Sequence, residues 1–222
     1  DCRVYLAGLV GDDENAALLR GLLDEAGIDG TGMVVRKGHV TTTKVRVLGS
    51  RQQMVRLDFE DAVPFEREEE DALAAWLDQR IAQGLDGMIL SDYKKGVLTD
   101  RMSQLVIERA RRAGIPVLVD PKGSDWHKYN GADFVTPNIK ELGDCCGEKI
   151  PNEGQAVVDA ARRLHEQYNF AHIMVTRSEK GITVIRKDGK GWNNPATAQE
   201  VFDVSGAGDT VAAAFLAAIA SH

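Results

Sequence analysis

Residues 203–209 read Asp-Val-Ser-Gly-Ala-Gly-Asp, and an alanine-rich apolar run, Thr210 to Ala220, follows immediately. A glycine-rich turn that opens a helix directs backbone N–H groups, and the positive end of the helix dipole, toward one point. That point suits a phosphate, or the charge that develops when a phosphoryl group moves. Asp209 lies in the same turn, where its carboxylate could take a proton from an attacking hydroxyl. The alternative is a plain tight turn with an aspartate cap.

The composition indicates a globular protein without a membrane or nucleic-acid role. The chain has 222 residues, of which 43% are hydrophobic, and it fits one large domain or one domain with a small appended element. No apolar run approaches the length needed to cross a bilayer. The net charge is −7 and the lysines and arginines are scattered, so we expect no nucleic-acid surface. Three cysteines without a disulfide pattern favour a reducing cytoplasm, and five dispersed histidines argue against a zinc site.

Helical and strand patterns alternate from residue 66 onward, which predicts a parallel sheet covered by helices on both faces. Before that point, the pattern predicts a strand over residues 3–7 and a helix over residues 14–26. The later predicted helices are 66–83, 99–113, 153–168 and the run after Gly208, and the predicted strands are 87–90, 116–119, 134–135, 172–175 and 182–185.

Residues 33–59 have a different period. Apolar residues there alternate with charged ones, which is typical of a half-buried antiparallel strand pair. We interpret this segment as a small separate sheet, a candidate β-lid over the edge of the main domain. Its cations are Lys44, Arg46, Arg51 and Arg56. They either solvate and protect the sheet edge or bind a phosphate already present on a sugar.

Polar groups follow four of the predicted strands, at Ser91-Asp92, Asp120 to Gly123, Thr136 to Asn138, and Thr176-Arg177. In open α/β sheets, ligands bind at the carboxyl ends of the strands. We therefore expect a common site there, with ordinary capping and turn chemistry as the alternative. In the first of these segments, Asp92 and Lys95 are candidate substrate contacts, although two adjacent lysines are also typical of a solvated turn.

Asn138 and Glu141 lie three residues apart where a strand passes into a helix. This spacing forms a capping box, or it holds Mg²⁺ and its waters against nucleotide phosphates. Lys122 follows Val-Asp-Pro at another strand end. It is either a solvated loop charge or a cation that neutralises phosphates during transfer.

Several strings resemble known kinases. Asp203 to Asp209 resembles the C-terminal motif of the ribokinase-like carbohydrate kinases of the phosphofructokinase-B type, and Asn138 to Glu141 matches their Asn-x-x-Glu motif in spacing and order. Softer matches resemble the kinase domain of bacterial heptose 7-phosphate kinases, which is often fused to an adenylyltransferase in ADP-heptose synthesis. These are Gly8 to Glu14, Thr41 to Arg46, Arg56 to Glu60, Ser91 to Gly96, and Asp120 to Gly123.

The resemblance implies a ribokinase-like α/β fold, with a central, mostly parallel sheet between helices and a small β-lid. It implies transfer of the ATP γ-phosphate to O1 of D-glycero-β-D-manno-heptose 7-phosphate, giving the 1,7-bisphosphate for the lipopolysaccharide core. Asp209 would be the general base, and the backbone N–H groups of Gly206, Ala207 and Gly208 would form the anion hole. Mg²⁺ would be held by Asn138 and, through water, by Glu141. The implied nucleotide-binding residues are Asn138, Ile139, Lys140, Glu141, Lys122, Thr176 and Gly181.

The same resemblance leaves alternatives open. The substrate could be another sugar or sugar phosphate, or the chain could be a nucleotide-binding fragment without activity. Such kinases have a further strand and a glycine-rich, Asn-containing sugar-binding segment before residue 3, and further helices after residue 222, so we expect both ends to be incomplete. We also expect a homodimer formed through the lid, and an adenylyltransferase domain in the full-length parent.

Overall fold

The computed structural model describes residues 2–49, 52–197 and 206–221. The chain forms two compact units, one of residues 1–79 with 95–97 and the other of residues 80–94 with 98–222. Residues 203–205 of the glycine-rich motif, and Arg51 of the candidate lid, lie outside the described residues.

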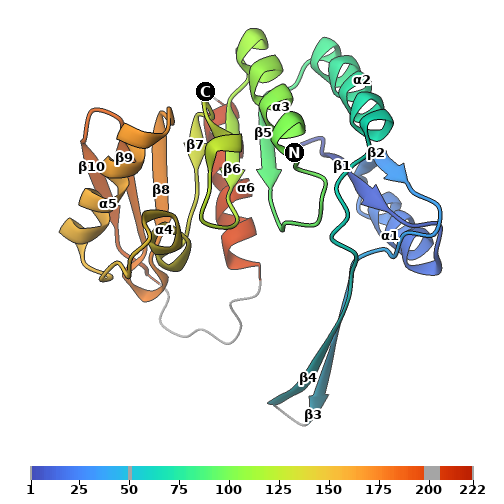
Figure 1. The fold of residues 1–222 in the computed structure, drawn as a ribbon, viewed down its shortest axis with the longest axis horizontal. Helices are drawn as coiled ribbons and strands as arrows, with labels where there is room; N and C mark the ends of the chain where they lie inside the picture. Colours follow the sequence, from blue (N-terminus) through green and yellow to red (C-terminus); the bar gives the residue numbers. More distant parts are fainter. Residues whose placement is uncertain (1, 50–51, 198–205, 222) are drawn as a thin grey trace. The chain divides into compact units, whose positions relative to one another are not determined.

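The first unit contains two small sheets and two helices. Its elements are β1 (Tyr5–Val10), α1 (Glu14–Glu25), β2 (Asp29–Val35), β3 (Thr43–Gly49), β4 (Gln52–Phe59) and most of α2 (Arg67–Gln83). β1 and β2 pair in parallel, with α1 as their connection (Figure 1).

The sequence-based bounds of this unit need correction. The predicted strand over residues 3–7 begins at Tyr5 and continues to Val10, and residues 33–35 belong to β2 rather than to the antiparallel segment. β2 escaped notice because Asp-Gly-Thr-Gly is a poor strand former by propensity. Close packing explains why residue 32 is glycine. A Cβ there would lie 2.8 Å from the Ala7 Cβ and 2.8 Å from the Trp76 ring.

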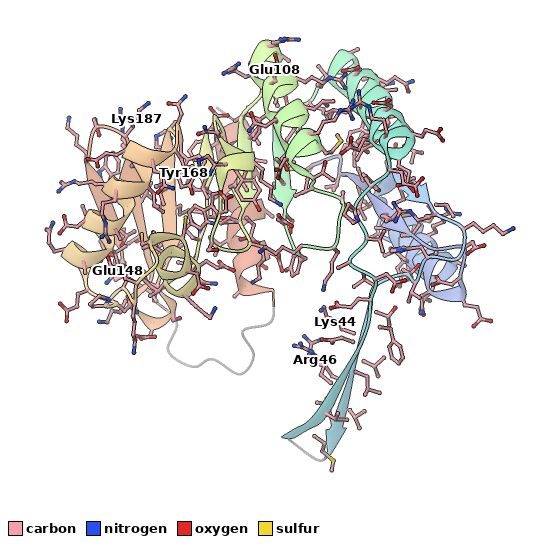
Figure 2. All side chains as sticks on the ribbon, in the orientation of Figure 1. Lys44, Arg46, Glu108, Glu148, Tyr168 and Lys187 are labelled. Carbon is pink, nitrogen blue, oxygen red and sulfur yellow. The ribbon has the colours of Figure 1, made fainter. Side chains whose placement is uncertain are left out.

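β3 and β4 form a two-stranded antiparallel sheet, the β3–β4 hairpin. Val45 lies opposite Leu57, and Lys44 lies opposite Asp58, so one face is apolar and the other is charged. Lys44 and Arg46 project from the same side of the hairpin, as Figure 2 shows.

The second unit is built on a six-stranded sheet in the order β10-β9-β8-β7-β6-β5. The four strands β5 to β8 are parallel, whereas β9 and β10 are antiparallel additions, so the predicted mostly parallel sheet is confirmed. The strands are β5 (Met88–Ser91), β6 (Val117–Asp120), β7 (Phe134–Val135), β8 (His172–Thr176), β9 (Ile182–Arg186) and β10 (Gly191–Asn194). β10 was not predicted, because its Gly-Trp-Asn-Asn sequence has neither a run of strand formers nor an alternating pattern.

Helices cover the sheet of this unit on both faces. They are α3 (Asp100–Ala113), α4 (Ile139–Cys146), α5 (Gly154–Gln167) and α6 (Ala207–Ala220), with short 3-10 turns η1 (His127–Tyr129) and η2 (Ser178–Lys180). Leu118 of β6 packs with Ala212 and Leu216 of α6. Val117 and Val119 are equally buried, and they face the opposite side, where α3 lies, because neighbouring strand residues alternate (Figure 1).

No helix in the described part of the chain is both long enough and apolar enough to span a membrane.

We expect Leu118→Ala to lower the free energy of unfolding by about 2–5 kcal/mol, because it leaves a cavity between β6 and α6. Urea unfolding followed by circular dichroism would measure the change. Leu18→Ala is the matched control, since Leu18 is 63% exposed on α1 and Leu118 is fully buried. A loss below about 1 kcal/mol for Leu118→Ala would show that this contact does not hold α6 to the sheet.

Candidate active site

The carboxyl ends of β5 to β8 lie along one edge of the sheet, as the sequence predicts. The segments that follow the strands stay linked by backbone hydrogen bonds. Asp92 N–H donates to the Asp120 carbonyl at 3.0 Å, and Thr176 N–H donates to the Pro137 carbonyl at 2.9 Å. Asn138 also forms a parallel bridge with Thr176. The four polar segments are therefore brought together within the second unit.

Asn138 and Glu141 begin α4 as a capping box, so the capping interpretation is confirmed. The Asn138 side chain accepts a hydrogen bond from Glu141 N–H at 2.9 Å, and Glu141 Oε2 accepts one from Asn138 N–H at 3.1 Å. Glu141 Oε1 accepts from Lys122 Nζ at 2.9 Å. Both carboxylate oxygens are thus held in place, which suits the predicted contact to a metal ion through water rather than directly.

The neighbours of Glu141 in the motif differ in exposure. Lys140 is strongly exposed and forms an ion pair with Asp144 at 2.7 Å, one turn further along α4. Ile139 is half-buried. The nucleotide-binding roles of Ile139 and Lys140 stay predictions.

Asp120 lies at the end of β6 in a surplus of negative charge. Burial, and then the charges of Glu141 and Asp209, raise the pKa of its carboxyl to about 6 against the opposing charge of Lys122. The carboxylates of Glu141, Asp209 and Asp92 therefore lie close enough to influence the pKa of Asp120, and Lys122 offsets their charge in part. Such an imbalance attracts a cation.

Asp209 lies in the first turn of α6. Gly206 precedes the helix with a positive φ of 73°, which glycine adopts without strain, and its carbonyl accepts from Thr210 N–H at 2.9 Å. The first N–H groups of α6 have no partner within the helix, as at any helix start. The predicted anion hole at Gly206, Ala207 and Gly208 stays a prediction, because part of the motif lies outside the described residues.

Tyr93 contacts the predicted base and was missed by the sequence analysis. Its hydroxyl donates to Asp209 Oδ1 at 3.2 Å. Burial raises the pKa of the Tyr93 phenol, and the charge of Asp209 adds to this effect. Tyr93 is the residue between Asp92 and Lys94, so attention to its place directly after a strand end could have found it.

Asp92 is buried and its contacts lie within the protein. Its carboxylate pairs with Lys128 Nζ at 2.5 Å, accepts a hydrogen bond from the Tyr129 hydroxyl, and accepts one from Lys94 N–H at 2.6 Å. Only 4% of the residue is exposed. The structure supports an anchoring role for Asp92, and the predicted contact to the substrate stays a prediction.

Thr176 and Gly181 flank the turn between β8 and β9. Arg177 is buried there, and its guanidinium donates to Asn152, Thr183 and Asn193. Gly181 has a φ of 82°, and a Cβ on it would lie 2.0 Å from the Asn194 carbonyl oxygen. A close backbone approach therefore explains this glycine, and the predicted nucleotide contacts stay predictions.

Two of the candidate lid cations, Lys44 and Arg56, are paired with acids of their own unit, as is Lys95. Lys44 and Lys95 both pair with Glu60, at 3.4 Å for Lys44, and Arg56 pairs with Asp58 at 2.8 Å. Arg46 is exposed, and among the described residues it has no hydrogen bond or ion pair. Among the described cations that were predicted to bind phosphate, Arg46 is therefore the one whose guanidinium is available to a ligand.

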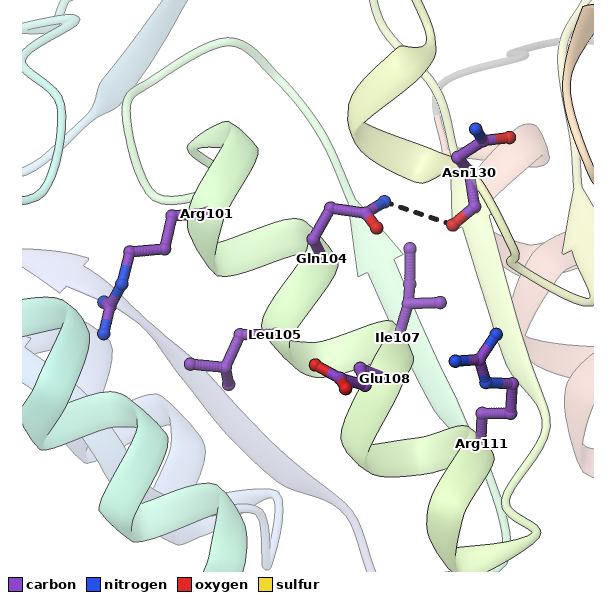
Figure 3. A pocket seen from close by; sticks show the side chains of 7 residues that line it. All are labelled: Arg101, Gln104, Leu105, Ile107, Glu108, Arg111 and Asn130. Atoms are coloured by element: carbon purple, nitrogen blue, oxygen red, sulfur yellow. Dashed lines mark hydrogen bonds between the residues drawn. The ribbon is translucent and has the colours of Figure 1, made fainter.

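A surface pocket of about 340 Å³ lies elsewhere in the second unit, along α3 (Figure 3). The Gln104 side chain lines it and donates to the Asn130 carbonyl at 3.1 Å. None of the predicted site residues lines this pocket, so the pocket is separate from the predicted active site.

The side-chain oxygens of Asn138 and Glu141 are ligands of the kind that Mg²⁺ prefers. Among residues 2–49, 52–197 and 206–221, no three His, Cys, Asp or Glu side chains come close enough to form a metal cage. Magnesium needs none, because it keeps several waters and binds through one or two carboxylates together with phosphates. The excess negative charge around Asp120 and Glu141 provides that environment.

We expect Asp120→Asn to raise the midpoint of thermal unfolding at pH 7.5 by roughly 3 °C and to change it little at pH 4. The folded-state pKa of Asp120 is raised to about 6, so the folded chain keeps a proton that the unfolded chain releases. Stability contributed by the protonated form is present below pH 4 and is lost as the pH rises through 6. Calorimetry in metal-free buffer at both pH values would measure this, and an equal effect at both would contradict the role of charge.

Comparison with known proteins gives the family. Residues 2–222 match the model of the pfkB family of carbohydrate kinases. The bifunctional protein HldE of Methylobacillus flagellatus is 43% identical over 218 residues, which cover 98% of this chain and 44% of the relative. HldE of Paramagnetospirillum magneticum is 44% identical, over 96% of this chain and 43% of the relative. The chain thus spans less than half the length of these curated relatives.

Solved structures show the same fold. A putative ribokinase from Agrobacterium tumefaciens aligns with a TM-score of 0.79 at 22% identity, over 99% of this chain and 68% of that one. Phosphofructokinase-2 from Escherichia coli aligns with a TM-score of 0.77 at 16% identity, over 99% and 70%. These likenesses establish a ribokinase-like α/β fold. Together with the family match, they show that this chain belongs to the pfkB family of carbohydrate kinases.

Proposed function

We propose that this chain is the kinase part of an enzyme that transfers the ATP γ-phosphate to O1 of D-glycero-β-D-manno-heptose 7-phosphate. The observation that carries the proposal is the position of Asp209, in the first turn of α6 and within hydrogen-bond reach of the loop after β5. The HldE relatives, at 43% and 44% identity, support the choice of a heptose phosphate.

In this proposal Asp209 takes the proton from the sugar hydroxyl, whose oxygen then forms a bond to the γ-phosphorus. The bond between that phosphorus and the β–γ bridging oxygen breaks, and ADP leaves. The N–H groups at the start of α6 and the positive end of its dipole stabilise the charge on the phosphoryl group in flight. A carboxylate beside these donors has a use as a base, which a protein that only binds nucleotide would not need.

Lys122, Asn138 and Glu141 would serve the nucleotide end of the site. Lys122 is 49% exposed and its side chain is held by Glu141 at 2.9 Å, so its ammonium is positioned and still reachable by a phosphate. Mg²⁺, when bound, would neutralise phosphate charge, with Glu141 contacting its waters. The surplus of carboxylate charge around Asp120 supports a cation at this point.

The β3–β4 hairpin would supply the lid, with Arg46 as the contact to the 7-phosphate. Its apolar face is exposed on both strands, for example at Val47 (41%), Val55 (44%) and Leu57 (46%). A second copy that covers this face would bury apolar area, so we propose a homodimer through the hairpin. The relatives are described as bifunctional, which supports a second, adenylyltransferase part in the full-length protein.

We expect Asp209→Asn to reduce kcat by about a hundredfold or more while ATP binding is retained, because the variant keeps the shape of the side chain and loses the base. Turnover in the full-length protein and calorimetric titration with ATP would measure the two properties separately. Asp188→Asn is a matched control, since Asp188 is a surface acid near Arg186. Turnover of Asp209→Asn equal to that of the parent would overturn the assignment of the base.

We expect the full-length protein to phosphorylate a heptose 7-phosphate at least about a hundredfold more efficiently, as kcat/KM, than the same sugar without its phosphate, because the charged group adds transition-state binding. A panel of sugar 7-, 6- and 1-phosphates, compared with unphosphorylated hexoses, would measure the preference. A higher kcat/KM for a 6- or 1-phosphate would assign the kinase to another sugar phosphate, and equal rates on hexoses would contradict a phosphorylated substrate.

A further inference from the structure

The buried carboxylate of Asp92 holds the loop that follows β5 in place. Asp92 accepts from the N–H of Lys94 at 2.6 Å, while Lys128 and Tyr129 approach it from η1. Lys94 adopts a φ of 55°, which a non-glycine residue keeps only when its surroundings enforce it. Lys128 and Tyr129 hold the carboxylate, which in turn accepts from Lys94 N–H and so favours this backbone conformation.

This anchor fixes where Tyr93 points. Asp92 is directed into the unit with 4% exposure, whereas Tyr93 is 51% exposed and reaches α6. Its hydroxyl lies 3.2 Å from Asp209 Oδ1, a contact between residues that are 116 positions apart in the sequence. The bond thus links the end of β5 to the first turn of α6, where the base is placed.

The Tyr93 hydroxyl is the hydrogen-bond donor to Asp209, and the properties of the two side chains favour this direction. Burial raises the pKa of the phenol above its ordinary value of 10, and the nearby charge of Asp209 raises it as well. A phenol is protonated near neutral pH even at its ordinary pKa, so the Tyr93 hydroxyl donates to the carboxylate there. A hydrogen bond to an ionised acceptor is also stronger than one between neutral groups.

The two oxygens of Asp209 differ in their contacts. Oδ1 accepts from Tyr93, whereas within the described part of the chain Oδ2 has no hydrogen-bond partner. We propose that Tyr93 is a positioning residue that holds Asp209 by Oδ1 and leaves Oδ2 to accept the proton of the sugar hydroxyl. This inference rests on the proposed kinase function, and it adds a residue to the site.

The test is Tyr93→Phe in the full-length protein, which removes the hydroxyl and keeps the ring. We expect kcat to fall about tenfold while KM for ATP and for the sugar phosphate stays within about twofold, because orientation of the base matters only during transfer. Tyr168→Phe is the matched control, since Tyr168 also uses its hydroxyl inside the second unit, with Trp126 and Gln167. Its kcat should be unchanged at a temperature below the unfolding midpoint of each variant.

A double-mutant cycle shows whether Tyr93 acts through Asp209. In an Asp209→Asn background, Tyr93→Phe should cause no further loss of the residual rate, because the group that it positions is already disabled. The inference is overturned by an unchanged kcat in the single variant, by a change confined to KM, or by the same tenfold loss in both backgrounds. Full turnover of Asp209→Asn would instead overturn the proposed function, so the two failures are distinguishable.

Discussion

Parallel hydrogen bonding between β5, β6, β7 and β8 is the constraint on which the rest of the second unit depends. Four strands that run in one direction must end at one edge, and every residue that follows a strand is then close to those that follow its neighbours. Asp92, Asp120 and Asn138 are far apart in the sequence and adjacent in the fold for this reason. α6 returns to the same sheet and adds Asp209 to the group.

The crowding of acids at this edge costs stability and creates the conditions for binding a cation. Asp120 is partly removed from water, and this burial, together with the charges of Glu141 and Asp209, raises the pKa of its carboxyl to about 6. Lys122 offsets only part of this charge. A site that binds a divalent cation and a polyphosphate gains from such an arrangement, because the cation removes the repulsion that the free protein contains.

Several residues that make structural contacts are also those with proposed chemical roles. Asn138 and Glu141 form a complete capping box, and the same hydrogen bonds hold the carboxylate that is proposed to face the metal. Asp92 is occupied by protein partners, yet it fixes the backbone from which Tyr93 reaches Asp209. An interpretation as a cap or an anchor therefore does not exclude a functional one. In such sites, the groups that stabilise a helix or a loop also preorganise the reacting atoms.

The sequence by itself determined the elements with strong local signals. Periodicity identified most helices and the parallel strands, and the glycine-rich motif with Asn138 and Glu141 indicated the family and the kind of reaction. β2 and β10 were missed, because their Gly- and Asn-rich segments become strands through pairing with β1 and β9 rather than through propensity. Only the tertiary structure decided which side chains meet. The contact of Tyr93 with Asp209, the burial of Asp92 and the raised pKa of Asp120 depend on distances between segments separated by tens of residues, and periodicity and local motifs do not encode those distances.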